Sequence, residues 1–129
     1  MNFAIQITCS PYAGNGGLTA FRFIETALQM NHQVNRVFFY KEGVYHAFKY
    51  NTPPDDELQL TAQWSALAER HDLDLVVCIS AAQRRGLLCE DEAKRQGKLD
   101  DDVAAGFRIG GLGQLLEATL TADRFVEFS

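Results

Sequence analysis

The sequence has no excess of basic residues, no long apolar run and no closely spaced cysteines. It carries 12 lysines and arginines against 17 aspartates and glutamates, for a net charge of −5. Tight binding to a nucleic-acid backbone needs a basic surface, which this composition does not offer. No stretch reaches the roughly 20 apolar residues of a membrane helix, and the first residues lack the basic start of a secretory signal. We therefore expect a cytoplasmic protein that binds neither membranes nor nucleic acid directly.

The three cysteines, Cys9, Cys78 and Cys89, are an odd number and lie far apart in the sequence. Without an export signal, free thiols are the default for such a chain. The three histidines are dispersed and show no metal-ligand spacing to one another or to a cysteine. The sequence therefore predicts neither a disulfide framework nor a metal site.

Two glycine-rich turns precede predicted helices, but neither matches a phosphate-binding motif. Residues 14–17 read Gly-Asn-Gly-Gly, with no Lys-Ser/Thr pair after them. Residues 111–113 read Gly-Leu-Gly, and Leu116 stands where a dinucleotide motif has its third small residue. We interpret both as turn and packing glycines and predict no cofactor. A flavodoxin-like nucleotide-binding module stays open as an alternative.

Strand-like and helix-like segments alternate along the chain. Apolar or alternating runs predict strands at residues 3–8, 34–40, 73–79, 107–109 and 124–128. Apolar residues at helical spacing predict helices at residues 18–30, 55–70, 90–96 and 111–121, and a short one from residue 81. Leu58, Ala62, Trp64 and Leu67 are expected on the inner face of the second helix. Such alternation is typical of a single doubly wound α/β domain over residues 1–129, with a mainly parallel sheet of about five strands and helices on both faces.

The connection at residues 41–56 is long, and connections of this length are often functional. It carries Tyr45, His46, Phe48 and Tyr50 within a short stretch. Several large aromatic side chains on a loop favour an interface or a lid over a place in the core. We therefore expect part of the 45–50 segment to lie at a subunit interface.

Cys78 is the strongest candidate for chemistry. It lies at the end of a predicted strand, and reactive groups of open α/β sheets lie beyond the carboxyl ends of the strands. The next helix would direct backbone N–H groups toward the sulfur, and Arg84 and Arg85 add positive charge one turn later. Each effect favours the thiolate. On position alone, a cysteine that only fills space in the core remains an equal alternative.

The other two cysteines are weaker candidates. Cys9 also ends a predicted strand, but no basic residue nearby would activate it, so we expect a buried structural role. Cys89 is followed by three consecutive acidic residues, which oppose thiolate formation. We expect Cys89 to be a passive thiol at the surface.

Four segments of the chain form a specific combination. They read RVFFYKEGVY at residues 36–45, CISAAQRRG at 78–86, GGLGQL at 110–115 and TADR at 121–124. Together they resemble the TusD/DsrE family of small sulfurtransferase subunits in bacterial sulfur relays, over essentially the whole chain. The resemblance implies that Cys78 accepts a sulfane sulfur and holds it as a persulfide. A persulfide would be anionic at neutral pH, and Arg84 and Arg85 are its expected stabilising charges.

The resemblance also implies partners and a pathway. Members of the family assemble with paralogous TusC/DsrF-like and TusB/DsrH-like subunits into a hexamer with two copies of each. A TusA-like protein donates sulfur, and a TusE/DsrC-like protein accepts it. One branch serves 2-thiolation of wobble uridine in tRNA, which we favour because it is more widespread, and the other serves oxidation of stored sulfur. A non-catalytic subunit, whose paralogue does the chemistry, is a further alternative.

Overall fold

Five parallel strands form the centre of the computed structural model, which describes residues 1–99 and 101–129. They are β1 (Asn2–Ile7), β2 (Gln33–Phe39), β3 (Leu75–Cys78), β4 (Phe107–Gly110) and β5 (Arg124–Phe128). Their order in the sheet is β4-β3-β2-β1-β5, and each neighbouring pair is parallel. The predicted parallel sheet is confirmed, and every strand overlaps its predicted range.

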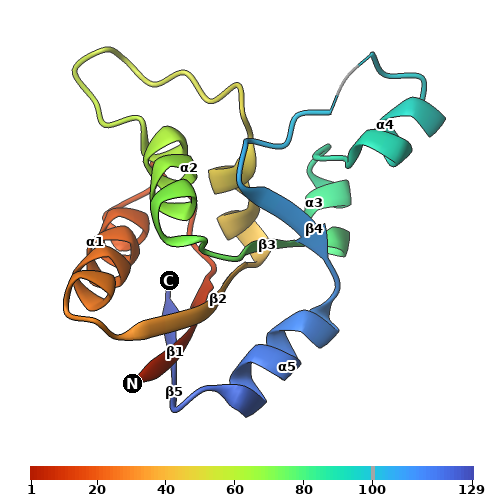
Figure 1. Cartoon of the computed structure of the whole chain (residues 1–129). Helices are drawn as coiled ribbons and strands as arrows, with labels where there is room; N and C mark the ends of the chain where they lie inside the picture. The colour runs from red at the N-terminus through yellow and green to blue at the C-terminus, as the bar shows by residue number, and fades with distance from the viewer. Residues whose placement is uncertain (100) are drawn as a thin grey trace.

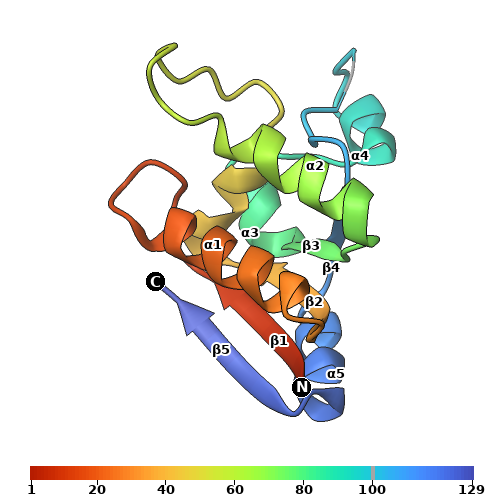
Figure 2. The same ribbon diagram turned by 60° about the vertical axis from the view of Figure 1, so that its left-hand side comes forward.

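Helices cover both faces of this sheet (Figure 1). On one face lie α1 (Gly16–Gln29) and α2 (Leu60–His71), and Figure 2 shows α5 (Leu112–Thr121) behind the other. The short helices α3 (Ile79–Arg84) and α4 (Glu90–Arg95) follow β3. The β4–α5–β5 connection runs from one edge of the sheet to the other, so the fold is doubly wound. Within the described residues, no helix is both long and apolar enough to cross a membrane.

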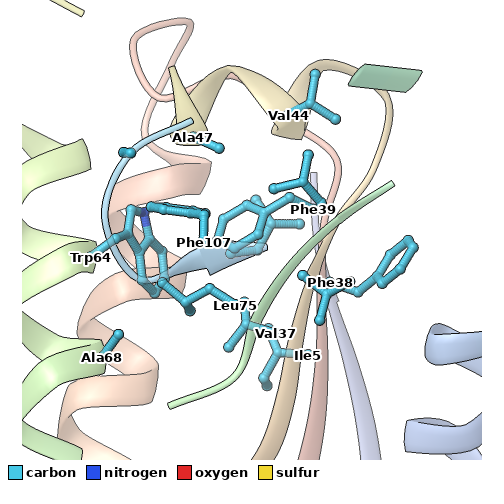
Figure 3. Close-up of a cluster of buried hydrophobic side chains, with 14 of the residues drawn as sticks. Ile5, Val37, Phe38, Phe39, Val44, Ala47, Trp64, Ala68, Leu75 and Phe107 are labelled. Atoms are coloured by element: carbon cyan, nitrogen blue, oxygen red, sulfur yellow. The ribbon is translucent and has the colours of Figure 1, made fainter. Parts of the chain in front are cut away.

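The main core lies between the sheet and the layer of α1 and α2 (Figure 3). Trp64 of α2 packs edge-on against Phe39 of β2 and Phe21 of α1, with ring centroids 5.4 and 5.1 Å apart. Phe107 of β4 extends the cluster, 5.2 Å from Phe39. Each buried side chain of this size contributes roughly 1.5–3 kcal/mol. Alternation along the strands therefore builds one apolar layer under both helices.

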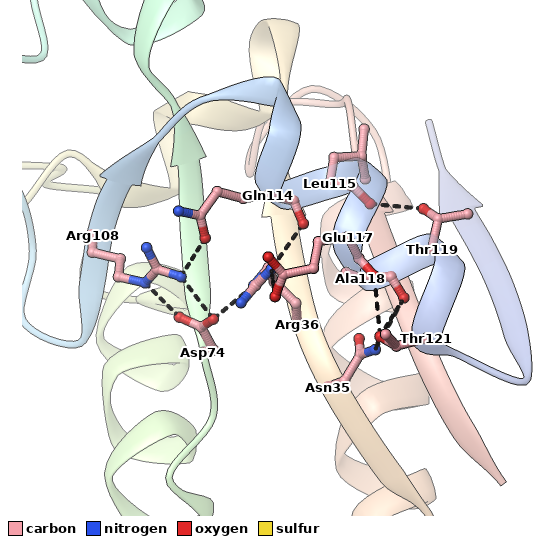
Figure 4. Close-up of polar contacts among 10 residues, drawn as sticks. All are labelled: Asn35, Arg36, Asp74, Arg108, Gln114, Leu115, Glu117, Ala118, Thr119 and Thr121. Carbon is pink, nitrogen blue, oxygen red and sulfur yellow. Dashed lines mark hydrogen bonds and ion pairs between the residues drawn. The ribbon is translucent and has the colours of Figure 1, made fainter.

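A polar cluster ties α5 to the opposite face near the amino ends of β2, β3 and β4 (Figure 4). Asp74 accepts hydrogen bonds from Arg36 Nε at 2.7 Å and from Arg108 Nε at 2.8 Å. The two arginines also donate to the Gln114 backbone and side-chain oxygens, at 2.8 and 2.7 Å. Burial raises the pKa of Asp74, but the hydrogen bonds from Arg108 and Arg36 outweigh it, so the pKa lies below its usual value. The cluster is a structural joint at the end of β3 remote from Cys78.

The helix α2 begins at Leu60, later than the sequence predicted. The residues before it form a loop instead of a first helical turn, because the Gln59 side-chain amide donates a hydrogen bond to the Asn51 backbone oxygen at 2.7 Å. Leu58 lies in this loop and is exposed, and Ala62 lies on the exposed side of α2, so the expected place of both on the inner face of a helix is wrong. The spacing of apolar residues could not predict this loop, because a hydrogen bond of a polar side chain helps to hold it.

His46 is fully buried where this core meets η1 (Lys41–Ala47), a 3-10 helix that follows β2. Trp64 Nε1 donates a hydrogen bond to His46 Nδ1 at 3.0 Å, and His46 Nε2 lies 3.1 Å from the Cys9 backbone oxygen. An indole N–H can only donate, so Nδ1 is the acceptor and Nε2 carries the proton. The interpretation of His46 as part of a lid or an interface is therefore wrong. Its ring ties η1 to α2 and to the end of β1.

The buried ring should make the stability of the protein depend on pH. Burial lowers the pKa of His46 from 6.5 to about 4. Between these values the unfolded chain binds a proton that the folded chain does not. The stability is therefore fully present above the unfolded pKa and is lost as the pH falls toward the folded one. A shift of this size corresponds to about 3 kcal/mol.

Urea-unfolding curves from about pH 7 to about pH 4.5 measure this dependence. The wild type should lose stability over this range, and His46→Asn, which can still donate and accept, should lose less. His71→Asn is the matched control, because His71 is exposed and should leave the slope unchanged. Equal slopes for the wild type and His46→Asn would contradict the assignment.

Candidate functional site

Cys78 is the last residue of β3, and its neighbours form the carboxyl end of the sheet. It pairs with Gly110, the last residue of β4, and α3 begins at the next residue, Ile79. Cys78 has an extended backbone, with φ −62° and ψ 123°, so the chain turns from strand to helix at this residue. The predicted position at a strand end before a helix is confirmed.

The thiol itself lies just below the surface. Cys78 is 1% exposed, whereas the next two residues, Ile79 and Ser80, are exposed. The sulfur lies 3.5 Å from the Ser80 hydroxyl oxygen. Sequence reasoning missed Ser80 as a polar neighbour, although its place two residues after the strand end was a usable signal. A hydroxyl at this place can donate a hydrogen bond to a thiolate.

The two arginines of the same segment have different surroundings. Arg85 donates from Nη2 and Nε to Glu42 Oε1, at 2.7 and 3.2 Å, and from Nη1 to the Ala81 backbone oxygen at 3.0 Å. Arg84 is exposed, and it has no hydrogen bond or ion pair within the described part of the chain. In that same part, no hydrogen bond joins either guanidinium group to Cys78. The charge of Arg85 is thus compensated by Glu42, and that of Arg84 is not.

Glu42 belongs to η1, which fits closely over the end of β1. A Cβ atom added at Gly43 would overlap the Ile7 backbone oxygen, so only glycine fits there. That oxygen also accepts a hydrogen bond from the Tyr40 backbone N–H at 2.9 Å. Lys41 has φ +51°, a left-handed conformation that non-glycine residues seldom adopt. The start of η1 is therefore held in a strained and closely packed conformation.

The other two cysteines lie apart from this site. Cys9 is half-buried rather than fully buried, with Sγ 4.0 Å from the Phe128 backbone oxygen. Burial raises the pKa of the Cys9 thiol, which disfavours its thiolate. Cys89 is exposed at the start of α4, as expected. Cys9 thus follows β1 with a disfavoured thiolate, and Cys89 does not stand at the end of a strand.

The two glycine turns differ in how closely they pack against their neighbours. A Cβ atom added at Gly16 would lie 2.7 Å from Cys9 Sγ, and one at Gly17 would lie 2.6 Å from a ring carbon of His46. These two residues therefore pack against neighbours, as expected. A Cβ atom added at Gly111 or Gly113 would meet nothing within 4 Å, so the expected packing role of these two glycines is wrong. Across residues 1–99 and 101–129, no three side chains of the types that bind metals lie together.

The chain belongs to the DsrE/DsrF-like family, whose model matches residues 1–128. A relative named DsrE, from Allochromatium vinosum, is 46% identical over 99% of this chain and 98% of its own length. Sulfurtransferase TusD from Enterobacter sp. (strain 638) is 41% identical over 99% of this chain and its full length. The crystal structure of the YchN protein from E. coli shares the fold, with a TM-score of 0.74 at 20% identity over 99% of this chain and all of that one. The resemblance seen in the four sequence segments is confirmed.

Proposed function

We propose that this chain is a sulfur-relay sulfurtransferase that holds sulfane sulfur as a persulfide on Cys78 and passes it to an acceptor protein. The observation that carries the proposal is the place of Cys78, a free thiol at the carboxyl end of a central strand, directly before a helix. Membership of the DsrE/DsrF-like family and 41% identity to a named sulfurtransferase support the reaction class.

Sulfur transfer follows the chemistry of thiol–disulfide exchange. The Cys78 thiolate attacks the outer sulfur of a donor persulfide, and the donor cysteine leaves as a thiolate. The acceptor thiolate then attacks the outer sulfur on Cys78, and Cys78 leaves as a thiolate. Each step replaces one S–S bond with another and consumes no electrons. The proposed reaction therefore uses no cofactor.

The persulfide anion would be stabilised by polar groups of the segment that follows Cys78. The Ser80 hydroxyl, 3.5 Å from the sulfur, can donate a hydrogen bond. The first backbone N–H groups of a helix have no partner within it and can also face an anion. Arg84 and Arg85 were both expected to contribute charge, and Arg84 is the stronger candidate because Glu42 compensates Arg85.

Exchange of Cys78 tests the proposal directly. Cys78→Ser should keep the fold, because the change is small, but abolish sulfur loading and delivery. Cys9→Ser and Cys89→Ser are the matched controls and should retain transfer near the wild-type rate. Transfer of radiolabelled sulfur from a TusA-like donor to a TusE/DsrC-like acceptor measures all three variants. Sulfur transfer by Cys78→Ser at the wild-type rate would contradict the proposal.

Family membership supports a sulfur-relay complex, and we propose TusC/DsrF-like and TusB/DsrH-like subunits as partners in a hexamer with two copies of each. Its proposed compartment is the cytoplasm, where free thiols persist. Apolar side chains are exposed at two places that such subunits would cover. One is Tyr50 in the 45–50 segment, and the other combines Phe125 of the edge strand β5 with an α5 stripe of Leu112, Leu116 and Leu120.

Charged substitutions on these two surfaces test the assembly. Tyr50→Asp and the double variant Leu116→Asp/Leu120→Asp should each lower the mass of the complex formed with the two paralogous subunits, because a buried charge without a partner is costly. Gln29→Asp, on the exposed side of α1, is the control. Light scattering gives the masses. A full-size complex with both charged variants would show that neither surface is a contact.

We propose 2-thiolation of wobble uridine in tRNA as the pathway supplied, with the tRNA bound by another protein. Oxidation of stored sulfur is the second candidate, because identity to the protein named DsrE is 46%. Deletion of the gene should remove 2-thiouridine from tRNA, measured by mass spectrometry of nucleosides. Unchanged 2-thiouridine together with slower consumption of stored sulfur would assign the chain to the second pathway.

A further inference from the structure

The proposed reaction requires the sulfur of Cys78 to be reached by the thiolate of another protein. Attack on sulfur needs access to the outer atom, but Cys78 is 1% exposed. The covering segment must therefore shift for each transfer. The segment that follows the thiol is α3, and an ion pair between Glu42 and Arg85 lies at its end.

The helix α3 follows the thiol directly and buries few side chains of its own. It spans six residues, and its buried side chains are the small Ala81 and Ala82. Gly86, at φ +85°, ends it, and the Leu87 backbone N–H closes the turn onto the Ala82 oxygen at 2.9 Å. Segments with little apolar burial open most readily from the native state. Because α3 follows Cys78 directly, its displacement would expose the sulfur.

An exposed ion pair, between Glu42 of η1 and Arg85 at the end of α3, adds to the packing of α3 against η1. The Arg85 guanidinium donates to Glu42 of η1 and also to the Ala81 oxygen within α3. We call these three groups the α3 clasp. The side chains of Glu42 and Arg85 are 55% and 21% exposed, so the ion pair is accessible to solvent, salt and approaching proteins. The clasp is therefore a contact that a docking partner can break.

We propose that Glu42 is a positioning residue for persulfide transfer: through Arg85 it holds α3 against η1 and limits access to the Cys78 sulfur. This inference rests on the proposed function of Cys78. It joins two of the segments that define the family resemblance, at residues 36–45 and 78–86, through a contact between residues 43 apart in the sequence. An opened clasp lets α3 move, and a closed clasp shields the persulfide between transfers.

Alkylation of Cys78 by the neutral reagent iodoacetamide, followed on its own peptide by mass spectrometry, measures this access. Arg85→Gln and Glu42→Gln should each raise the limiting rate at high pH, where the thiol is fully ionised, by about 2- to 5-fold, as expected for a weak surface pair. If Arg85 acted only by stabilising the thiolate, the result would differ. Its loss would then lower the fraction of thiolate at neutral pH and leave the limiting rate at high pH unchanged.

Four controls separate the clasp from a general effect on the fold. Arg70→Gln breaks an exposed ion pair of α2, with Glu25, and should leave the limiting rate unchanged. Alkylation of the exposed Cys89 measures the activity of the reagent in each sample, and its rate should be the same in every variant. High salt should speed alkylation of wild-type Cys78 but not of Glu42→Gln, because salt screens the exposed pair. The charge-swapped double variant Glu42→Arg/Arg85→Glu restores an ion pair at this place, so its Cys78 should be alkylated at a rate close to that of the wild type.

Unchanged or lower limiting rates in both Arg85→Gln and Glu42→Gln would overturn the clasp. The proposed function would still stand if Cys78→Ser had lost sulfur transfer. A wild-type Cys78 that takes up no sulfur would overturn the proposed function, and with it this inference. Urea unfolding of each variant, read by Trp64 fluorescence, shows whether a rate change comes from the clasp or from lost stability.

Discussion

The hydrogen bonds of the His46 ring fix the relative positions of three elements at the carboxyl end of the sheet. The ring accepts from Trp64 of α2 and donates to the Cys9 backbone, so it connects η1 with α2 and the end of β1. Glu42 lies in the same η1 segment and accepts hydrogen bonds from the guanidinium of Arg85, which directly follows α3. The ring thus helps to place the segment that carries Glu42, the partner of Arg85.

A sulfur carrier has to protect a reactive persulfide and still release it to a chosen partner. A parallel sheet with a short helix after β3 offers both properties, because the thiol at the strand end is buried while the next two residues are exposed. Strong apolar packing lies on the α1 and α2 side, with large rings such as Trp64 and Phe39. The buried side chains within α3 are small, and the buried Leu87 follows it. The two sides of the site thus differ in the size of their buried groups.

The sequence predicted what depends on local pattern. Continuous apolar runs at residues 34–40 and 73–79 indicated the central strands, and the strand end indicated Cys78. Contacts between distant side chains left no such pattern. His46 meets Trp64 18 residues later in the chain, and Arg85 meets Glu42 43 residues earlier. A stretch rich in aromatic residues therefore looked like a lid, although its histidine lies in the core.

The most direct test of the central claim is to locate the sulfur itself. The protein is loaded with sulfane sulfur, digested without reductant, and its three cysteine peptides are weighed. The peptide containing Cys78 should gain the mass of one sulfur atom and lose it on treatment with a thiol. Sulfur found on the Cys9 or Cys89 peptide, or on none of the three while the acceptor is still supplied, would contradict the account.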